Sequence, residues 1–288
     1  MRILVEIRRV IFILLGVVCA QTSRAAADEV VTFASARYLV GSLQQRLARE
    51  RGEPVKRAPV EMIKGYLSRP AGPGPFPAVV HLHGCGGLLE QRRIDAEKQF
   101  TDWGYVTLVV DSFATRGIKD ACAAGPIPSR QADAMGALVY LSKLPFVDPD
   151  RIAVAGYSQG GIAALEIASH QSVDVFEVPA GLKFRAVVAY YPWCSAAADR
   201  LAIPTLILIG ELDDWTPATS CDYLLRRFDP SGAPLKVTVF PAVYHSFDSA
   251  AAGVYGTRYY GHWLRYNADA TARAAAEARA FLAKELSQ

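Results

Sequence analysis

The stretch AGYSQGG, residues 155–161, places a serine between two glycines. It follows the apolar run at residues 152–155 and leads into residues 160–170, whose composition is typical of a helix. Because glycine has no Cβ, the chain can turn sharply on both sides of Ser158. A serine in such a strand–turn–helix is exposed above a sheet, at the positive end of a helix, which favours a nucleophile. The alternative is a serine that only caps the helix.

The segments around this serine alternate between strand-like and helix-like patterns. Strands are predicted at residues 78–83, 105–110, 152–155, 184–191, 204–209 and 235–240, and helices at residues 89–103, 130–144, 160–170, 217–228 and 270–286. Most of these strands are largely apolar, and strands that are apolar throughout are buried on both faces. We therefore predict an α/β fold with a mostly parallel central sheet flanked by helices on both faces. The carboxyl ends of the parallel strands then meet at one edge, where binding sites collect.

Two other segments have a clear local pattern. Residues 146–150, FVDPD, predict a turn, because Asp-Pro ends helices. Residues 41–58 are polar and charged, and we expect an exposed helix or loop there.

A serine nucleophile needs a base, and His245 is the best placed histidine. It follows the predicted strand at residues 235–240 and therefore lies at the same edge of the sheet as Ser158. His262 stands among aromatic residues, and we expect it to pack against them. The order in the chain, with serine before histidine, is the one that this kind of fold requires.

An acid that orients the histidine should lie between Ser158 and His245. The stretch LIGELDDWTP, residues 208–217, follows a predicted strand and supplies Asp213, which is the preferred candidate. Asp214 is the second choice and Glu211 the third. The alternative is that a carboxylate in this turn only caps the next helix.

The negative oxygen of a tetrahedral intermediate needs two backbone N–H donors. One is expected from Gln159, the residue after the serine. The other is expected from the glycine-rich stretch HLHGCGG, residues 81–87, where Cys85 is preferred and Gly86 is the alternate. An ordinary glycine turn is the competing interpretation of this stretch.

From about Met62 to the C-terminus, the chain resembles the dienelactone hydrolase family of the α/β-hydrolase superfamily. The resemblance rests on GYLSRP (65–70), FPAVVHLHGCGG (76–87), RIAVAGYSQGG (151–161), LIGELDDWTP (208–217) and YHSF (244–247). It implies an α/β-hydrolase fold and ester hydrolysis. The name-giving enzymes use a cysteine nucleophile where this chain has Ser158, and a glutamate where it has His83. The resemblance therefore does not imply dienelactone as the substrate.

Together these residues predict a serine hydrolase that cleaves an ester or lactone bond of a small substrate through Ser158, Asp213 and His245, without a metal or organic cofactor. The alternatives are an exported, non-catalytic binding protein with this fold, or a peptidase or depolymerase. Arg116 follows a strand at the same edge and is a candidate for binding a substrate carboxylate, with a surface arginine as the alternative. Aromatic residues cluster near the end of the chain, where they are expected to pack on the last helix or to wall the pocket: Tyr255, Tyr259, Tyr260 and Trp263.

The N-terminal residues 1–27 have the pattern of a secretory signal peptide. Two arginines precede the apolar run VIFILLGVVCA, residues 10–20, which is too short to span a membrane. Cleavage is expected after Ala20 or Ala27, and an uncleaved membrane anchor is the alternative. The prediction is an exported chain, periplasmic or secreted, with residues 28–288 as a single domain.

The charge and the cysteine content of the chain bear on nucleic-acid binding, disulfide bonds and structural metals. The net charge of +3 falls to near zero when residues 1–27, with four arginines and one glutamate, are removed. No basic cluster is present, so a nucleic-acid partner is not expected. Removal of residues 1–27 also removes Cys19 and leaves four of the five cysteines. An even number in an exported chain indicates disulfides, for which composition alone allows three pairings. From their positions after predicted strands we predict Cys85–Cys122 and Cys194–Cys221. No pair has the C-x-x-C spacing of a zinc site, so no structural metal is expected.

Overall fold

The computed structural model describes residues 29–123, 127–169 and 175–287. Its centre is an eight-stranded sheet in the order β1-β2-β4-β3-β5-β6-β7-β8. The strands are β1 (Glu29–Ala34), β2 (Met62–Ser68), β3 (Phe76–Leu82), β4 (Val106–Asp111), β5 (Val147–Tyr157), β6 (Ala186–Tyr190), β7 (Thr205–Gly210) and β8 (Leu235–Phe240). β2 is antiparallel to β1 and β4, and every other neighbouring pair is parallel. The predicted α/β fold with a mostly parallel sheet is confirmed.

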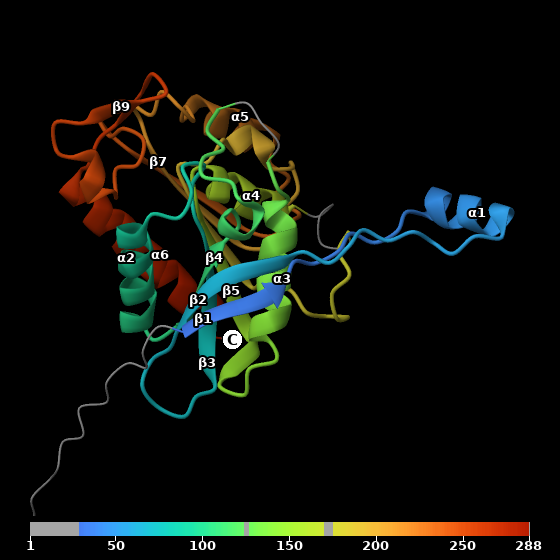
Figure 1. Cartoon of the computed structure of the whole chain (residues 1–288). Coiled ribbons are helices and arrows are strands. Elements are labelled where there is room, and N and C mark those ends of the chain that lie inside the picture. Colours follow the sequence, from blue (N-terminus) through green and yellow to red (C-terminus); the bar gives the residue numbers. More distant parts are fainter. Residues whose placement is uncertain (1–28, 124–126, 170–174, 288) are drawn as a thin grey trace, which may run out of the picture.

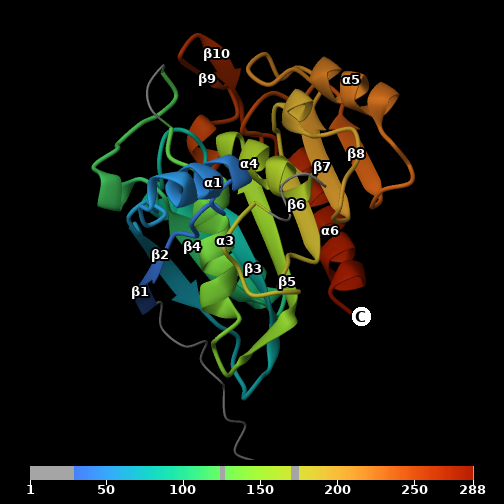
Figure 2. The same ribbon diagram turned by 90° about the vertical axis from the view of Figure 1, so that its right-hand side faces the viewer.

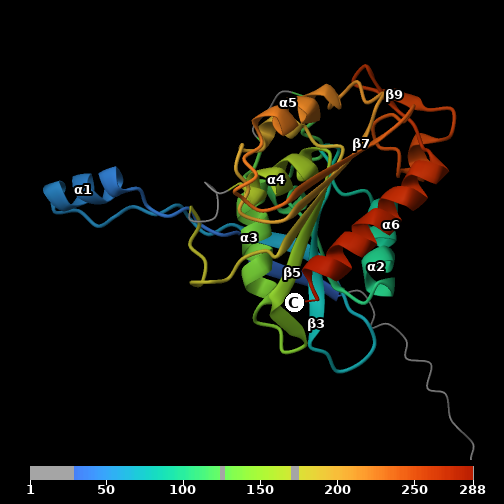
Figure 3. The same ribbon diagram turned by 180° about the vertical axis from the view of Figure 1, so that it is seen from behind.

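Helices cover both faces of the sheet. They are α1 (Ser42–Arg51), α2 (Glu90–Asp102), α3 (Arg130–Leu141), α4 (Gln159–Ala168), α5 (Thr219–Arg227) and α6 (Ala268–Glu285), with short 3₁₀ turns η1 (Ala114–Arg116), η2 (Cys194–Ala196) and η3 (Ala250–Ala252). α2 and α6 lie on one face, and α3 and α4 lie on the other (Figures 1 and 3). Every residue of β4, β6 and β7 is buried, because helices exclude water from both sides of these strands.

The structure differs from the sequence prediction at three places. β1 and β2 pair antiparallel, and a small hairpin of β9 (Thr257–Tyr259) and β10 (His262–Leu264) follows β8. These strands are short or mix polar with apolar residues, so their pattern is weak. The predicted turn at residues 146–150 is wrong, because Val147 pairs with Phe76 beside an irregularity in the register and keeps this segment within β5.

Helix α1 contains no buried residue and stands away from the rest of the molecule (Figures 1 and 3). This agrees with the exposed helix or loop predicted for residues 41–58. Residues 1–27, the predicted signal peptide, lie outside the described residues. In the described ranges, no helix combines the length and the apolar character needed to cross a bilayer.

Candidate active site

Ser158 lies in a strained turn between β5 and α4. Its backbone has φ 54° and ψ −117°, which a residue other than glycine adopts only where the surrounding structure holds it. Its N–H donates to the carbonyl of Tyr190 at 2.9 Å. A Cβ at Gly156 would lie 2.0 Å from the oxygen of Gly160, and one at Gly160 would lie 2.3 Å from the oxygen of Leu82. Both glycines are therefore required for the turn to pack against the end of β3.

The side chain of Ser158 does not cap helix α4, although the residue occupies the N-cap position. Its Oγ lies 3.0 Å from Nε2 of His245. Nδ1 of His245 lies 2.7 Å from Oδ2 of Asp213. The structure thus brings the serine, histidine and aspartate named from the sequence into one hydrogen-bonded chain, with each residue following its own strand.

Asp213 is held by its own turn. Its Oδ1 accepts hydrogen bonds from the N–H groups of Trp215, at 3.0 Å, and Thr216, at 2.8 Å, which leaves Oδ2 facing the imidazole. The hydroxyl of Thr216 lies 3.0 Å from Oδ2 of Asp213 and 3.2 Å from Nδ1 of His245. Thr216 was not named as a partner of the histidine, and only its contacts place it there.

The other two carboxylates of this turn point elsewhere. Asp214 accepts a hydrogen bond from the N–H of Trp263 at 3.0 Å. Glu211 accepts one from the N–H of Ala242 at 2.9 Å. Neither caps α5, whose N-cap residue is Ala218 and has no side-chain cap. Among the three candidate acids, only Asp213 has a hydrogen bond to His245 in the described part of the chain.

The imidazole of His245 is packed between two aromatic rings. Its ring centroid lies 4.6 Å from that of Tyr191 and 5.2 Å from that of Trp215. The side chain is 2% exposed. This packing limits rotation of the ring and keeps Nε2 directed at Ser158.

The glycine-rich loop after β3 lies beside the serine. A Cβ at Gly84 would be 3.6 Å from the Cβ of Ser158. Cys85 lines the cavity, and its carbonyl accepts a hydrogen bond from the N–H of Ala121 at 2.8 Å. Within the described residues, the N–H groups of Cys85 and Gln159 have no hydrogen-bond acceptor in the protein.

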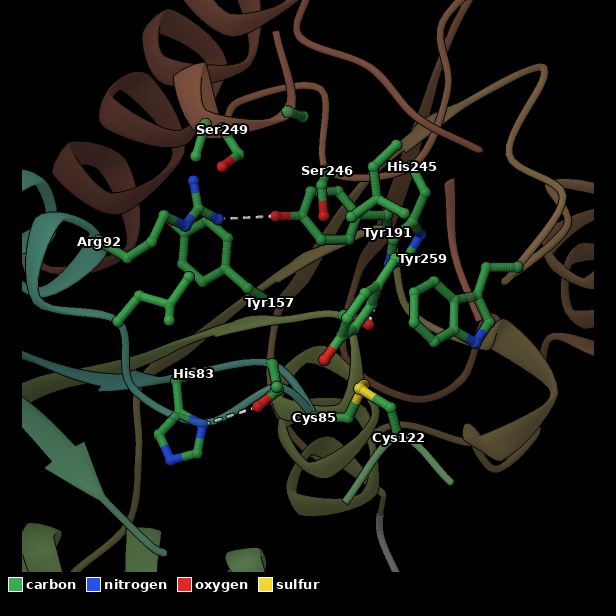
Figure 4. A pocket seen from close by; sticks show the side chains of 18 of the residues that line it. His83, Cys85, Arg92, Cys122, Tyr157, Tyr191, His245, Ser246, Ser249 and Tyr259 are labelled. Atoms are coloured by element: carbon green, nitrogen blue, oxygen red, sulfur yellow. Dashed lines mark hydrogen bonds between the residues drawn. A yellow bond between two sulfur atoms is a disulfide. The ribbon is translucent and has the colours of Figure 1, made fainter. Parts of the chain in front are cut away.

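His83 stands at the start of this loop (Figure 4). Its Nδ1 lies 2.7 Å from the carbonyl oxygen of Gly84, and its ring packs edge-on against Phe113 at 4.7 Å. Burial, with the nearby Arg130 cation, lowers the pKa of His83 well below its usual value. His83 is therefore neutral at physiological pH.

Ser158 lines a cavity of about 370 Å³. Figure 4 shows other residues of its walls. We call the side beside α2 and η3 the rear wall, which includes Tyr157, Tyr191 and Arg92. We call the side formed by the Cys122 loop and the β9–β10 hairpin the outer wall, which includes Tyr259. The hairpin lies at the same end of the molecule as α5 (Figure 2).

The rear wall contains a partly buried ion pair that the sequence analysis did not find. Arg92 donates to Asp248 through Nη1, at 2.9 Å, and through Nη2, at 3.3 Å. Nη2 also lies 2.9 Å from the hydroxyl of Tyr191 (Figure 4). This hydroxyl donates to Asp248 at 2.7 Å. Asp248 is three residues after His245, which is the only sequence signal for this pair. Nothing in the sequence links Arg92 to it, because 156 residues separate the two side chains.

The outer wall is built from aromatic rings. Tyr259 and Tyr260 both hydrogen-bond Asp120 through their hydroxyls. The ring of His262 stacks on Trp215 with centroids 5.0 Å apart, in agreement with the aromatic packing expected for it. The rings of Tyr259 and Tyr260 pack on Trp215, in the turn that carries Asp213. Tyr259 also lines the cavity, which agrees with the alternative that some of these aromatic residues wall the pocket.

Arg116 lies outside the cavity. Its guanidinium donates to Asp133 at 2.7 Å, to the carbonyl of Ser112 at 2.7 Å, and also to Glu61. It is not among the described residues that line the cavity. The suggested role in binding a substrate carboxylate is therefore not supported, and the arginine instead ties η1 to α3 and to the start of β2.

Both predicted disulfides are present. Cys85–Cys122 lies in the cavity wall and joins the glycine-rich loop to the loop after η1 (Figure 4). Cys194–Cys221 joins η2 to α5. Neither cysteine of the second bond is among the described residues that line the cavity.

Known proteins share parts of this sequence and structure. A curated relative, the quorum-quenching protein AidA of Acinetobacter baumannii (strain MDR-ZJ06), is 28% identical over 155 residues, which cover 50% of this chain and 46% of that protein. This chain thus matches about half the length of that relative.

Two solved structures share the fold. A dienelactone hydrolase-like promiscuous phosphotriesterase from metagenomic libraries has a TM-score of 0.62 and 19% identity, covering 90% of this chain and 99% of that one. Thermogutta terrifontis esterase 2, phosphoramylated by tabun, has a TM-score of 0.58 and 19% identity, covering 77% and 89%. The sequence model of the dienelactone hydrolase family matches residues 63–286. With this match over most of its length, the chain belongs to the dienelactone hydrolase family.

Proposed function

We propose that this protein is a serine hydrolase that cleaves an ester or lactone bond of a small substrate. Ser158 is the nucleophile, His245 is the general base and Asp213 orients the histidine. The observation that carries the proposal is the hydrogen-bonded chain from Ser158 through His245 to Asp213 at the wall of the cavity. The reaction is acyl transfer to water through a covalent acyl-enzyme.

In the first step, Nε2 of His245 removes the proton of Ser158 as Oγ attacks the substrate carbonyl. The Asp213 carboxylate holds the Nδ1 proton and stabilises the imidazolium that forms. His245 then gives its proton to the leaving alcohol, and the acyl group stays on Oγ. A water molecule, deprotonated by the same histidine, attacks the acyl-enzyme and releases the acid.

We propose the N–H groups of Cys85 and Gln159 as the donors to the oxyanion. Their positions beside Ser158, without another acceptor in the described part of the protein, support this assignment. Such donors act mainly on the transition state, and one of them is worth about 3 kcal/mol, or about 100-fold in kcat. Gln159 is also the first residue of α4, where the helix dipole favours negative charge.

The test of the proposal is the Ser158→Ala variant, assayed on p-nitrophenyl esters and with a fluorophosphonate probe. Removal of the nucleophile should lower kcat by about 10⁶-fold and abolish labelling. Ser249→Ala is the matched control, because it removes another cavity hydroxyl that is not part of the hydrogen-bonded chain, and it should still be labelled. Hydrolysis by Ser158→Ala at the parent rate would sink the proposal.

The same probe separates the rival functions. A folded protein that is not labelled would favour a non-catalytic binding module. A labelled protein that cleaves peptides or polymers faster than small esters would favour a peptidase or depolymerase on this fold.

We also propose that the mature protein begins at Gln21 or Asp28, is exported to an oxidising compartment and contains residues 28–288 as a single domain. The two disulfides support this location, because such bonds persist in the periplasm and outside the cell. Mass spectrometry of the expressed protein should show a chain that begins at Gln21 or Asp28. A full-length chain with all five thiols free would contradict the proposal.

A further inference from the structure

The charged and polar side chains of the rear wall affect the binding of charged substrates in the cavity. Arg92 rises from the first turn of α2, lines the cavity and is 24% exposed. Its charge is matched by Asp248, which is 12% exposed and receives both terminal nitrogens of the guanidinium. A paired arginine and carboxylate of this geometry together carry no net charge.

Arg92 keeps its charge across the physiological pH range. Burial acts to lower the pKa of Arg92, but the Asp248 carboxylate outweighs burial and raises it above its usual value. The hydroxyl of Tyr191 accepts a hydrogen bond from Arg92 and donates one to Asp248. Arg92 therefore stays charged, and Asp248 cancels that charge within hydrogen-bond distance.

Four other polar side chains of the cavity lining are neutral: His81, His83, Tyr157 and Tyr191. Burial, reinforced by Arg92, lowers the pKa of His81 to about 3. Burial raises the pKa of both Tyr157 and Tyr191 above the usual tyrosine value. His83 is neutral for the reason given above. At neutral pH a substrate therefore meets uncharged tyrosine rings and uncharged imidazoles in this part of the cavity. The charge of Arg92 is neutralised by Asp248.

A carboxylate that entered this part of the cavity would lose its hydration without meeting a net positive charge, which is costly. An uncharged acyl group would bury its surface against the rings of Tyr157 and Tyr191 at no such cost. The other arginine of the lining, Arg258, belongs to the exposed outer wall, where water screens its charge.

We propose that Asp248 is a specificity-determining residue that cancels the charge of Arg92 and makes the cavity select esters of uncharged acids over esters of acids bearing a second carboxylate. The proposal rests on the ester hydrolysis proposed above and names its substrate class. Asp248 acts through Arg92 and does not take part in the chemical step.

The test uses two substrates of the same shape that differ only in charge, the mono-4-nitrophenyl ester of terephthalic acid and the 4-nitrophenyl ester of 4-carbamoylbenzoic acid. The parent protein should have the higher kcat/KM on the carbamoyl ester. Asp248→Asn leaves Arg92 uncancelled and should shift the ratio of the two kcat/KM values towards the carboxylate by about tenfold. Arg92→Gln leaves Asp248 uncancelled and should shift the ratio the other way.

The double variant Asp248→Asn/Arg92→Gln is the matched control, because it is again neutral and should return the ratio to near the parent value. Reading a ratio within each variant separates charge selection from any general loss of activity caused by a disturbed histidine loop. An unchanged ratio in both single variants, or a parent protein that prefers the carboxylate, would overturn the inference. Failure of the proposed function looks different, because neither ester would be cleaved and Ser158 would not be labelled.

Discussion

The site has an inner wall, by which we mean Ser158, Asp213, His245 and the turns that carry them, and it is built differently from the outer wall. Ser158, Asp213 and His245 follow the ends of β5, β7 and β8, and the backbone around Gly156, Gly160 and Gly210 leaves no space for a side chain at these glycines. The outer wall is more exposed, and a disulfide together with hydroxyl–carboxylate bonds to Asp120 holds it in place. The comparison indicates that the reacting groups depend on the rigid sheet, whereas access depends on loops that can change with less effect on stability.

The largest effect should come from the inner wall. Asp213→Asn should lower kcat by about 10⁴-fold, because an amide no longer holds the required tautomer of His245. Asp214→Asn is the matched control, since the neighbouring carboxylate bonds the hairpin and not the imidazole, and it should retain most of the activity. Steady-state kinetics on a p-nitrophenyl ester measures both. Equal losses in the two variants would show that the inner wall does not depend on Asp213.

The next largest effect should come from the Cys85–Cys122 disulfide, which joins the glycine-rich loop beside Ser158 to the outer wall. Replacing both Cys85 and Cys122 by alanine should lower kcat by up to about 100-fold, because the loop that presents the Cys85 N–H is released. It should also lower the free energy of unfolding by about 3 kcal/mol. The pair Cys194→Ala/Cys221→Ala should cost similar stability but leave kcat nearly unchanged, because that bond lies away from the cavity. Equal kcat losses in both double variants would remove the distinction between the two disulfides.

A third effect concerns His81, a buried histidine of β3, and appears as a dependence of the free energy of unfolding on pH. The pKa of His81 is about 3 in the folded chain and near 6.5 in the unfolded one, so the unfolded state binds the proton first as the pH falls. The stability that this residue contributes is present above pH 6.5 and is lost progressively between pH 6.5 and pH 3. At pH 5 the loss should be about 2 kcal/mol.

Urea unfolding at pH 7.5 and pH 5 measures this loss. His81→Leu should reduce the difference between the two pH values by about 2 kcal/mol, because its apolar side chain cannot bind the proton. An identical pH dependence in the parent and the variant would contradict a buried neutral His81.

The smallest effect should come from the outer wall. Tyr259→Phe removes the hydroxyl that bonds Asp120 but keeps the ring beside the cavity. The bond is exposed, so the change in kcat/KM on a small ester should be about threefold or less, and it should fall mainly on KM. A loss as large as that of Asp213→Asn would mean that the outer wall takes part in the chemical step.

The comparison of the two walls also explains which site residues could be predicted from the sequence. Ser158, Asp213 and His245 each follow an apolar strand, and parallel strands carry their carboxyl ends to one edge, so local pattern was enough to name them. The two disulfide pairings followed from the same order of strands. Arg116 also follows a strand at that edge, but Asp133 and Glu61 hold its guanidinium away from the cavity, and no local pattern announces such an ion pair.

The sequence by itself determined the sheet, the turn at Ser158 and the order of the three hydrogen-bonded residues, because the period of apolar residues and the absence of a Cβ at two glycines act over short distances along the chain. Only the tertiary structure decided that Arg92 meets Asp248, that Thr216 contacts His245, and that an aromatic hairpin closes the outer wall. These contacts join side chains of different elements, and their distances and charges depend on how the elements pack. The charge of the cavity, and with it the class of ester proposed here, is therefore a property of the packed molecule.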